Sequence, residues 1–293
     1  MRVIFDRSAF HGANFTALAN SPLRDLVASG RISVFHTPVF LEETILSYGS
    51  KDGSDDWRAH LAFAVEVCNG GIFLAKDEIW HNELVRDHGP AAQHLHPNHY
   101  NRLYESLPSF LQTLRGVAES GDLGKDWLDS QAEREAAQEK KTNQKGIFRE
   151  LREEIADALK AGRIDGRPRD YPFSEFLKSQ FNRTGRQFMS IVDAERSEAL
   201  ARQWAHNPAR FPYYSAFIEG VLYSAYYAMI EHNLRLDRNA QADFEQLAYL
   251  LWADVVVSND ERFFRSAFQT LWAPHGRRME SVESFTTLVR ELT

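Results

Sequence analysis

The sequence is poor in cysteine: it has one, Cys68, so no disulfide can form within the chain. This usage is typical of proteins that work in a reducing compartment. Cys68 ends the apolar run "LAFAVEVC". That setting indicates a small buried side chain rather than a catalytic nucleophile, which would need a neighbouring histidine and an orienting group.

Long uncharged hydrophobic runs are also missing. The most apolar stretch, "FPYYSAFIEGVLYSAYYAMIEH" at residues 211–232, contains Glu219 and ends in Glu231 and His232. A membrane span needs about 20 residues with few or no charges, so this run predicts a core helix and no membrane association. The opening "MRVIFDRSAF" lacks the apolar segment of a secretory signal. We therefore expect a cytoplasmic protein.

An excess of positive charge is absent as well. The chain has 34 Lys and Arg against 41 Asp and Glu, which gives a formal net charge of -7. A protein that coats nucleic acid non-specifically is basic, so this balance argues against that class. The negative net charge is still compatible with an enzyme that binds nucleic acid through a local patch of opposite charge. Glycine-rich phosphate-binding loops of the P-loop or dinucleotide type are not found either.

What is present is an ordinary globular composition over 293 residues, 43% of them hydrophobic and 26% charged. Short β-branched runs alternate with helical patterns at both ends of the chain, and this order predicts a parallel α/β sheet. We expect strands at residues 2–5, 32–35, 72–75 and 254–258, with a last short strand within 277–292. We expect helices at residues 20–31, 37–49, 55–71, 239–253 and 260–272, and at the C-terminus.

The middle of the chain differs, because no convincing strand occurs between about residues 77 and 234. Helices are expected at 101–119, 186–206 and 211–233, and the highly charged segment 131–163 is typical of a solvated helix pair. The simplest architecture is a discontinuous α/β core with a helical insertion. The core is expected to comprise residues 1–80 and 236–293, and the insertion residues 81–235.

Carboxylates follow the ends of the expected strands. Asp6 comes just after the first strand, and Asp260 just after the late valine strand. Glu42 and Glu43 lie early in the helix after the second strand, and Asp243 near the start of the helix that leads into the valine strand. In a parallel sheet with right-handed crossovers, these positions share the edge formed by the carboxyl ends of the strands.

Carboxylates gathered on one edge repel one another, by about 4 kcal/mol for a pair 4 Å apart at an effective dielectric constant of 20. A divalent cation removes this repulsion, and oxygen ligands favour Mg²⁺ or Mn²⁺. Such an ion can activate water for phosphodiester cleavage. Each acid alone is explained as well by capping, but the set on one edge favours a metal. Asp254 precedes the valine strand, roughly 20 Å from Asp260, and is excluded.

Three segments, "VIFDRSAF", "TPVFLEETI" and "ADFEQLAYLLWADVVVSNDERFF", together resemble the acidic signature of PIN-domain nucleases. The matched segments fall within roughly the first 80 and the last 60 residues. The resemblance implies a three-layer α/β PIN-like fold with a central, mainly parallel sheet. The large all-helical insertion is not explained by it.

The resemblance also implies an activity, that of a metal-dependent endoribonuclease, a hydrolase acting on phosphodiester bonds. Asp6, Glu43, Asp243 and Asp260 would hold one or two Mg²⁺ or Mn²⁺ ions, with a bound water as the nucleophile. Substrate binding would fall to Ser8 and Ser258, helped by the basic neighbours Arg7, His11 and Arg262.

Two of these ligand positions have an acidic neighbour. Glu42 is adjacent to Glu43, and only one of them can face the site; Glu43 is preferred because the family's glutamate usually stands directly before an apolar or small residue. Asp237 precedes the same helix as Asp243, which is preferred because it stands beside the apolar face that must pack on the sheet.

Two other functions stay open. One is a catalytically inactive PIN-like module that binds RNA or a protein, and the other is an unrelated α/β phosphoesterase. "VIFDRS" is similar to the aspartate loop of haloacid-dehalogenase-like phosphatases, but Ser8 stands where these need a second aspartate. The partners expected are an RNA substrate and, as a further option, a protein such as a neutralising antitoxin or a second copy of the chain.

Overall fold

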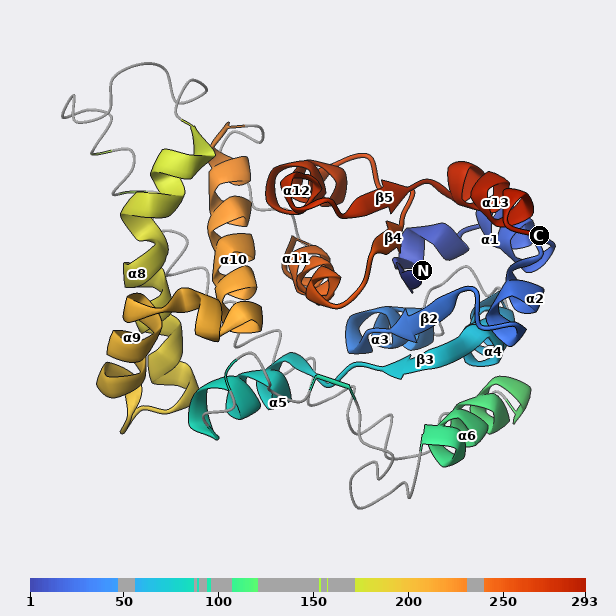
Figure 1. Cartoon of the computed structure of the whole chain (residues 1–293), viewed down its shortest axis with the longest axis horizontal. Coiled ribbons are helices and arrows are strands. Elements are labelled where there is room, and N and C mark those ends of the chain that lie inside the picture. Colours follow the sequence, from blue (N-terminus) through green and yellow to red (C-terminus); the bar gives the residue numbers. More distant parts are fainter. Residues whose placement is uncertain are drawn as a thin grey trace.

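The computed structural model describes residues 1–46, 56–86, 89, 94–95, 107–120, 153, 157, 172–230 and 240–293. Its centre is a five-stranded sheet in which every strand pair is parallel (Figure 1), so the predicted α/β class with a parallel sheet is confirmed. The strand order is β3-β2-β1-β4-β5. The strands are β1 (Arg2–Phe5), β2 (Ser33–His36), β3 (Cys68–Ile72), β4 (Val255–Val257) and β5 (Arg278–Glu280).

The central strands β1 and β4 are apolar on both faces because helices cover both faces. Val3 pairs with Val255 and Phe5 with Val257, and these four side chains enter one hydrophobic core. Ile4 and Val256, between them, enter the other core. This alternation divides the molecule into a helical layer, the sheet and a second helical layer.

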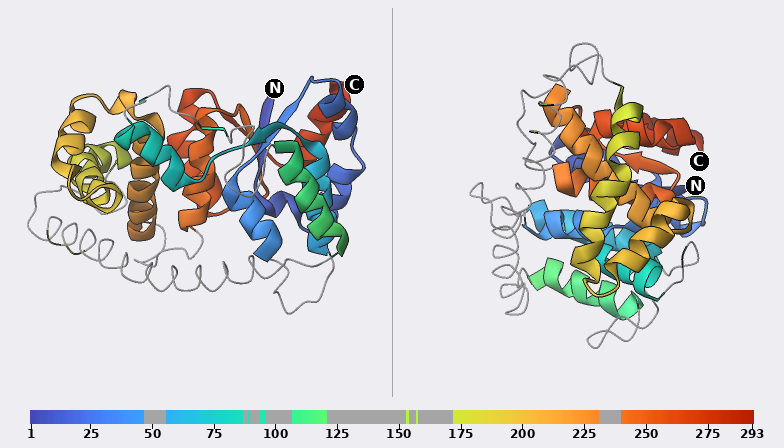
Figure 2. Two further views of the ribbon diagram at one scale, coloured as in Figure 1. Left: turned by 90° about the horizontal axis from the view of Figure 1, so that it is seen from below. Right: turned by 90° about the vertical axis from the view of Figure 1, so that its left-hand side faces the viewer.

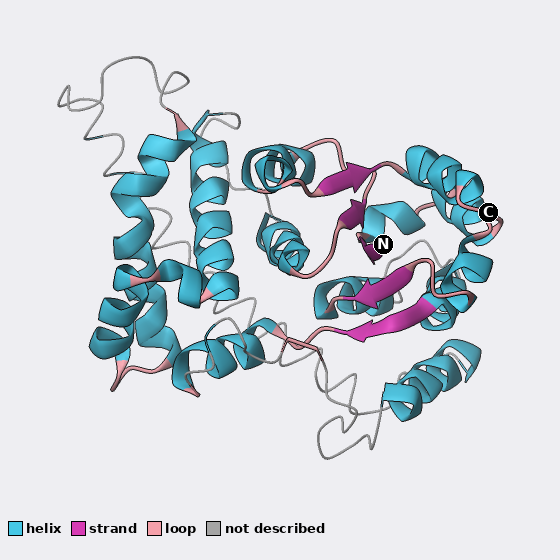
Figure 3. Ribbon diagram, viewed as in Figure 1, coloured by secondary structure: helices cyan, strands magenta, loops and turns pink. Residues whose placement is uncertain are grey.

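Helices lie on both sides of the sheet (Figure 3), and each layer draws its helices from distant parts of the chain. The helices whose buried side chains join the core of Val3 and Phe5 include α1 (Ala13–Ala19), α2 (Leu23–Ala28), α3 (Pro38–Leu46), α4 (Asp56–Val67), α6 (Leu107–Ser120) and α13 (Val282–Glu291). Those joining the core of Ile4 and Val256 include α5 (Lys76–Trp80), α11 (Ala240–Ala248) and α12 (Phe263–Leu271).

The sheet has one point at which its order reverses. From β1 the chain proceeds outward through β2 and β3, whereas β4 and β5 lie on the other side of β1. In open α/β sheets, ligands bind beyond the carboxyl ends of the strands at such a reversal. Asp6 and Ser258 directly follow the two strands that flank it. The topology therefore directs attention to the loops after β1 and β4.

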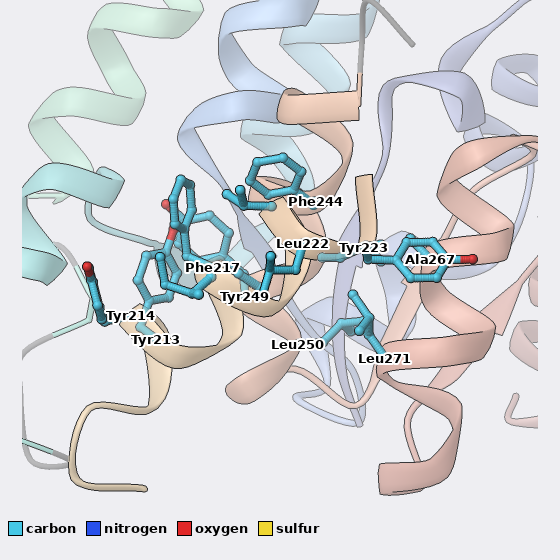
Figure 4. Close-up of a cluster of buried hydrophobic side chains, with 14 of the residues drawn as sticks. Tyr213, Tyr214, Phe217, Leu222, Tyr223, Phe244, Tyr249, Leu250, Ala267 and Leu271 are labelled. Carbon is cyan, nitrogen blue, oxygen red and sulfur yellow. The ribbon is translucent and has the colours of Figure 1, made fainter. Parts of the chain in front are cut away.

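Three further helices extend the layer that contains α11 and α12 (Figure 2). Helix α10 (Pro212–Ile230) packs directly on α11: the ring centroids of Phe217 and Phe244 are 5.2 Å apart, within a cluster of apolar side chains (Figure 4). Gly220 makes this approach possible, because a Cβ there would lie 2.8 Å from the Cβ of Phe244. The three helices are α8 (Phe173–Val192), α9 (Ser197–His206) and α10 (Pro212–Ile230).

The middle of the chain contributes to both sides of the sheet. The core of Ile4 continues through α10 to Trp204 of α9. Helix α6 (Leu107–Ser120) instead packs on α4, where Arg58 Nε donates a hydrogen bond to the Ala118 carbonyl at 2.6 Å. The division into an α/β core and an insertion at 81–235 stays a prediction. Most of the charged segment 131–163 lies outside the described residues.

The third strand differs from expectation. The helix predicted at 55–71 ends at Val67, and β3 occupies Cys68–Ile72 rather than 72–75. Its sequence, "CNGGI", has poor strand propensity. Gly70 lies where a Cβ would be 2.6 Å from the Phe35 ring, so the close approach of the neighbouring strand requires glycine there.

The helix predicted at 186–206 is two helices. Helix α8 ends at Val192, and Asp193 Oδ1 accepts a hydrogen bond from the Arg196 backbone N–H at 3.0 Å before α9 begins. Helix α8 also starts at Phe173 rather than at the predicted residue 186. Among the described helices, none is long and apolar enough to cross a membrane.

Candidate functional site

Asp6 is the centre of the loops that follow β1 and β4. Its side chain is buried, and its Oδ2 accepts hydrogen bonds from the Ser8 backbone N–H at 3.1 Å, from the Ser8 hydroxyl and from Ser258 Oγ at 2.8 Å. Its own backbone N–H donates to the Val257 carbonyl at 2.9 Å. The aspartate is thus anchored by both strands of the topological reversal.

The two carboxylate oxygens of Asp6 differ. All three donors converge on Oδ2, and Oδ1 accepts no hydrogen bond from any residue that the structure describes. A carboxylate with one oxygen anchored has its orientation set while the other oxygen can still bind a cation or a proton. Asp6 therefore has the form of a ligand-binding carboxylate rather than of a fully satisfied cap.

A short chain of hydrogen bonds joins the two loops. The hydroxyl oxygens of Ser8 and Ser258 lie 3.0 Å apart. The backbone N–H of Asn259 donates to Ser8 Oγ at 2.9 Å, and that of Asp260 donates to Ser258 Oγ at 3.1 Å. The sequence pattern did not single out Asn259, whose Oδ1 accepts from the Val282 backbone N–H at 2.8 Å and ties the site to α13.

The backbone N–H of Asp260 hydrogen-bonds within the site, to Ser258 Oγ, whereas its carboxylate is turned to the start of α12. Its Oδ1 accepts a hydrogen bond from the Arg262 backbone N–H at 2.7 Å, immediately before α12. An aspartate that accepts from the backbone N–H two residues on forms an Asx turn, here directly before the helix, whose N-cap residue is Arg262. Arg262 itself is exposed.

The carboxylate of Glu43 interacts electrostatically with that of Asp6. Burial raises the pKa of Glu43 to about 7, and the negative charges of Asp6 and Glu42 add to the rise while Arg7 opposes it. Within the described part of the chain, Glu43 makes no hydrogen bond. A half-buried acid beside another acid stores electrostatic repulsion that a bound cation would relieve.

Asp243 lies on α11, one helical turn before Gln246. Residues three apart share a helix face, and the Gln246 side chain reaches the Phe5 carbonyl at 2.7 Å. This places Asp243 on the turn of α11 that adjoins the edge bearing Asp6. Its alternative, Asp237, falls outside the described residues.

The basic residues of the first loop differ in charge state. Partial burial and the charge of Arg7 lower the pKa of His11 below 6.5, and Asp6 only partly opposes them. His11 is therefore neutral at pH 7 and would meet a phosphate as a hydrogen-bonding group rather than as a cation. Arg7 acts electrostatically on both His11 and Glu43, so its positive charge belongs to the site.

The described residues include no group of three or more His, Cys, Asp and Glu side chains arranged to hold a metal ion. Asp6 and Glu43 are close enough to interact electrostatically, but neither Asp243 nor Asp260 completes a three-residue group with them. Mg²⁺ is commonly bound through one or two carboxylates, and water and substrate phosphates complete its coordination. The pair Asp6 and Glu43, with Oδ1 of Asp6 open, fits such a hydrated ion.

The opposite ends of the same two strands carry another aspartate. Asp254 receives hydrogen bonds from Arg2 Nη2 at 2.7 Å and Arg2 Nε at 3.3 Å, and Arg277 Nη1 lies 3.4 Å away. The hydrogen bond from the Arg2 guanidinium, with its positive charge, lowers the pKa of Asp254 below 3.8. Asp254 is therefore a satisfied structural carboxylate, remote from the site.

Comparison of the chain with models of known protein families, with curated proteins and with solved structures gave no match. Inferences about function therefore rest on the geometry of the chain itself.

Proposed function

We propose that the chain is a metal-dependent ribonuclease, PIN-like in its acidic residues, which hydrolyses phosphodiester bonds at the edge formed by the ends of β1 and β4. The observation that carries this proposal is the pair of Asp6 and Glu43, two carboxylates that repel each other at the topological reversal of a parallel sheet. Ligand sites in this fold class lie at that place, and acids with perturbed pKa values are enriched in active sites.

Asp6 and Glu43 would hold the Mg²⁺ or Mn²⁺ ion. When bound, such an ion supplies an activated water and stabilises the charge that develops on a phosphodiester. The open Oδ1 of Asp6 and the partly buried carboxylate of Glu43 are the oxygens available to it. Asp243 and Asp260, nearby on the same edge, are proposed to act around the ion rather than in a four-ligand cluster.

The remaining residues orient this pair and the substrate. Ser8 and Ser258 hold Oδ2 of Asp6 and so direct its second oxygen. Arg7 places positive charge beside the carboxylates, where it can pair with a phosphate oxygen. Glu43, with a pKa near 7, can take up or release a proton at neutral pH.

The test compares Mn²⁺ binding and cleavage of an end-labelled, unstructured RNA of mixed sequence in four proteins. These are the wild type, Asp6→Asn, Glu43→Gln and the control Asp254→Asn. Asp6→Asn and Glu43→Gln should weaken Mn²⁺ binding and lower cleavage by about 10²-fold or more, the scale of one catalytic acid or base. Asp254→Asn removes a carboxylate from the other edge and should leave both properties unchanged.

Two results would overturn the proposal. A folded wild-type protein that binds no divalent ion at millimolar concentration would leave an inactive module that binds RNA or a protein partner. Hydrolysis of a small phosphomonoester without cleavage of RNA would identify an α/β phosphoesterase of another kind.

A further inference from the structure

Gln246 is a buried polar residue on α11 that connects both carboxylate-bearing segments. Its side chain is 2% exposed. Nε2 donates a hydrogen bond to the Phe5 carbonyl at 2.7 Å, and Oε1 accepts one from the Thr37 hydroxyl. One side-chain amide thus spans the end of β1 and the start of α3.

The contact with Phe5 bears directly on Asp6. The Phe5 carbonyl and the Asp6 N–H belong to one planar peptide unit. Gln246 holds the carbonyl side, and the Val257 carbonyl accepts from the N–H side at 2.9 Å. A planar group held at both ends cannot rotate. The direction in which the Asp6 side chain leaves the backbone is therefore set jointly by α11 and β4.

The contact with Thr37 bears on Glu43. Thr37 Oγ1 accepts a hydrogen bond from the Phe40 backbone N–H at 3.1 Å and so caps the start of α3, while its proton goes to Gln246. Glu43 lies six residues further along, about 9 Å of helix rise. The start of the helix that carries Glu43 is therefore tied to the same amide that holds the Asp6 peptide.

We propose that Gln246 is a positioning residue of the carboxylate site, which sets the relative placement of Asp6 and Glu43 and thereby the affinity of the site for a divalent cation. The cation rests on the function proposed above, whereas the placement of the two carboxylates rests on the hydrogen bonds alone. Such supporting residues matter because a ligand that is free to turn binds a metal more weakly.

A buried amide can also serve stability alone, and the chain offers a matched case. Asn69 Oδ1 accepts from the Val34 backbone N–H at 2.8 Å, and Nδ2 donates to the carbonyls of Val27 and Ile32 at 2.9 Å each. Asn69 also holds neighbouring backbone segments together, but near the start of β2. Removing it should lower stability without moving Asp6 or Glu43.

The experiment compares Gln246→Leu with Asn69→Leu in the full chain. Two readouts are taken: the Mn²⁺ dissociation constant, and the side-chain carboxyl ¹³C resonances of Asp6 and Glu43 at one fixed pH. Gln246→Leu should raise the dissociation constant by about 10- to 100-fold, the usual effect of losing a residue that orients metal ligands. It should also shift both resonances. Asn69→Leu should lower the melting temperature and leave both readouts unchanged.

Thr37 supplies a second pair of variants, which serves also if Gln246→Leu does not fold. Thr37→Val keeps the shape but removes the hydroxyl that donates to Gln246 and accepts from Phe40. It should weaken Mn²⁺ binding and shift the Glu43 resonance. Thr37→Ser keeps the hydroxyl and should restore the wild-type values.

Equal effects of Gln246→Leu and Asn69→Leu on both readouts, or no effect of Thr37→Val, would reduce Gln246 to a stabilising residue. If the wild type binds no Mn²⁺, the proposed nuclease function fails, but the resonances still decide the present question. Shifts in Gln246→Leu and Thr37→Val without shifts in Asn69→Leu would uphold the positioning role, and their absence would refute it.

Discussion

The two ends of the strand pair β1 and β4 lie beside acids in opposite electrostatic settings. At the amino end, Asp254 is held by the Arg2 guanidinium, with Arg277 close by, and its pKa lies below 3.8. At the carboxyl end, burial raises the pKa of Glu43 to about 7, and the negative charges of Asp6 and Glu42 add to the rise. The first setting favours the charged form of Asp254, and the second opposes the charged form of Glu43.

The direction of the pKa shift distinguishes acids that stabilise the folded state from acids that destabilise it. An acid whose pKa is lowered by folding stabilises the folded state, whereas one whose pKa is raised destabilises it at neutral pH. Proteins retain such unfavourable groups where a ligand or a reaction uses them. Substitutions at the two ends should therefore change stability in opposite directions.

The largest expected effect is a gain of stability in Glu43→Gln. The pKa of Glu43 is about 7 in the folded chain against 4.5 for the unperturbed group. Each pKa unit corresponds to about 1.4 kcal/mol, so ionising Glu43 costs about 3 kcal/mol of folding free energy above pH 7. The penalty is absent well below pH 4.5, grows between pH 4.5 and 7, and levels off above pH 7. Urea unfolding should show the variant more stable than wild type at pH 8, with a much smaller difference at pH 5.

Glu83 provides the control for Glu43→Gln. Burial raises its pKa to about 7 as well, but its two oxygens accept the backbone N–H groups of Tyr213 and Tyr214 at 3.0 Å each, at the start of α10. In glutamine an NH2 group replaces one of the two oxygens, and this group cannot accept a hydrogen bond from a backbone N–H. At pH 5, Glu83→Gln should therefore lose about 1–3 kcal/mol of stability through an unsatisfied buried donor. Equal behaviour of the two variants at pH 5 would contradict this distinction.

Ser258→Ala should have the next largest effect, a loss of about 1–3 kcal/mol, because its hydroxyl is fully buried and serves two partners. It donates to Asp6 and accepts from the Asp260 backbone N–H. Urea unfolding measures the loss, and Mn²⁺ titration should show weaker binding because Asp6 is less firmly oriented. Undiminished Mn²⁺ binding would mean that Ser8 alone orients the carboxylate.

The smallest effect is expected for Asp254→Asn, a loss of no more than about 1 kcal/mol, because the pair with Arg2 is partly exposed to solvent. Since folding lowers the pKa of Asp254, its stabilisation is present above pH 3.8 and is lost as the pH falls through the lower folded value. Acid unfolding of wild type and variant should therefore converge at the lowest pH. A change in Mn²⁺ affinity would contradict the separation of the two edges.

Much of the sheet could be predicted because its central strands are apolar on both faces. The runs at residues 2–5 and 255–257 have this pattern, and the structure places β1 and β4 there. Strand β3 could not be predicted in the same way. "CNGGI" becomes a strand through tertiary contacts: Asn69 satisfies the Val34 backbone N–H, and Gly70 admits the Phe35 ring.

The candidate site divides in the same way. Parallel topology is enough to predict that Asp6 and Glu43 lie at one edge of the sheet. The hydrogen bond from the Arg262 N–H to Asp260 could not be predicted from "SNDERFF", since the same aspartate could have faced inward. The burial of Gln246 could not be predicted either, because a glutamine in an amphipathic helix is usually an ordinary surface residue.

The sequence by itself determined the parallel α/β class and predicted the edge of the sheet for Asp6 and Glu43, because the alternation of strands and helices and the apolar periodicity are local properties of the chain. Only the tertiary structure decided which acids are satisfied and which repel each other. Hydrogen-bond partners and burial come from segments that are distant in the chain, such as those of Asp6 and Ser258, which lie 252 positions apart. Such distant contacts distinguish the structural Asp254 from the pair Asp6 and Glu43.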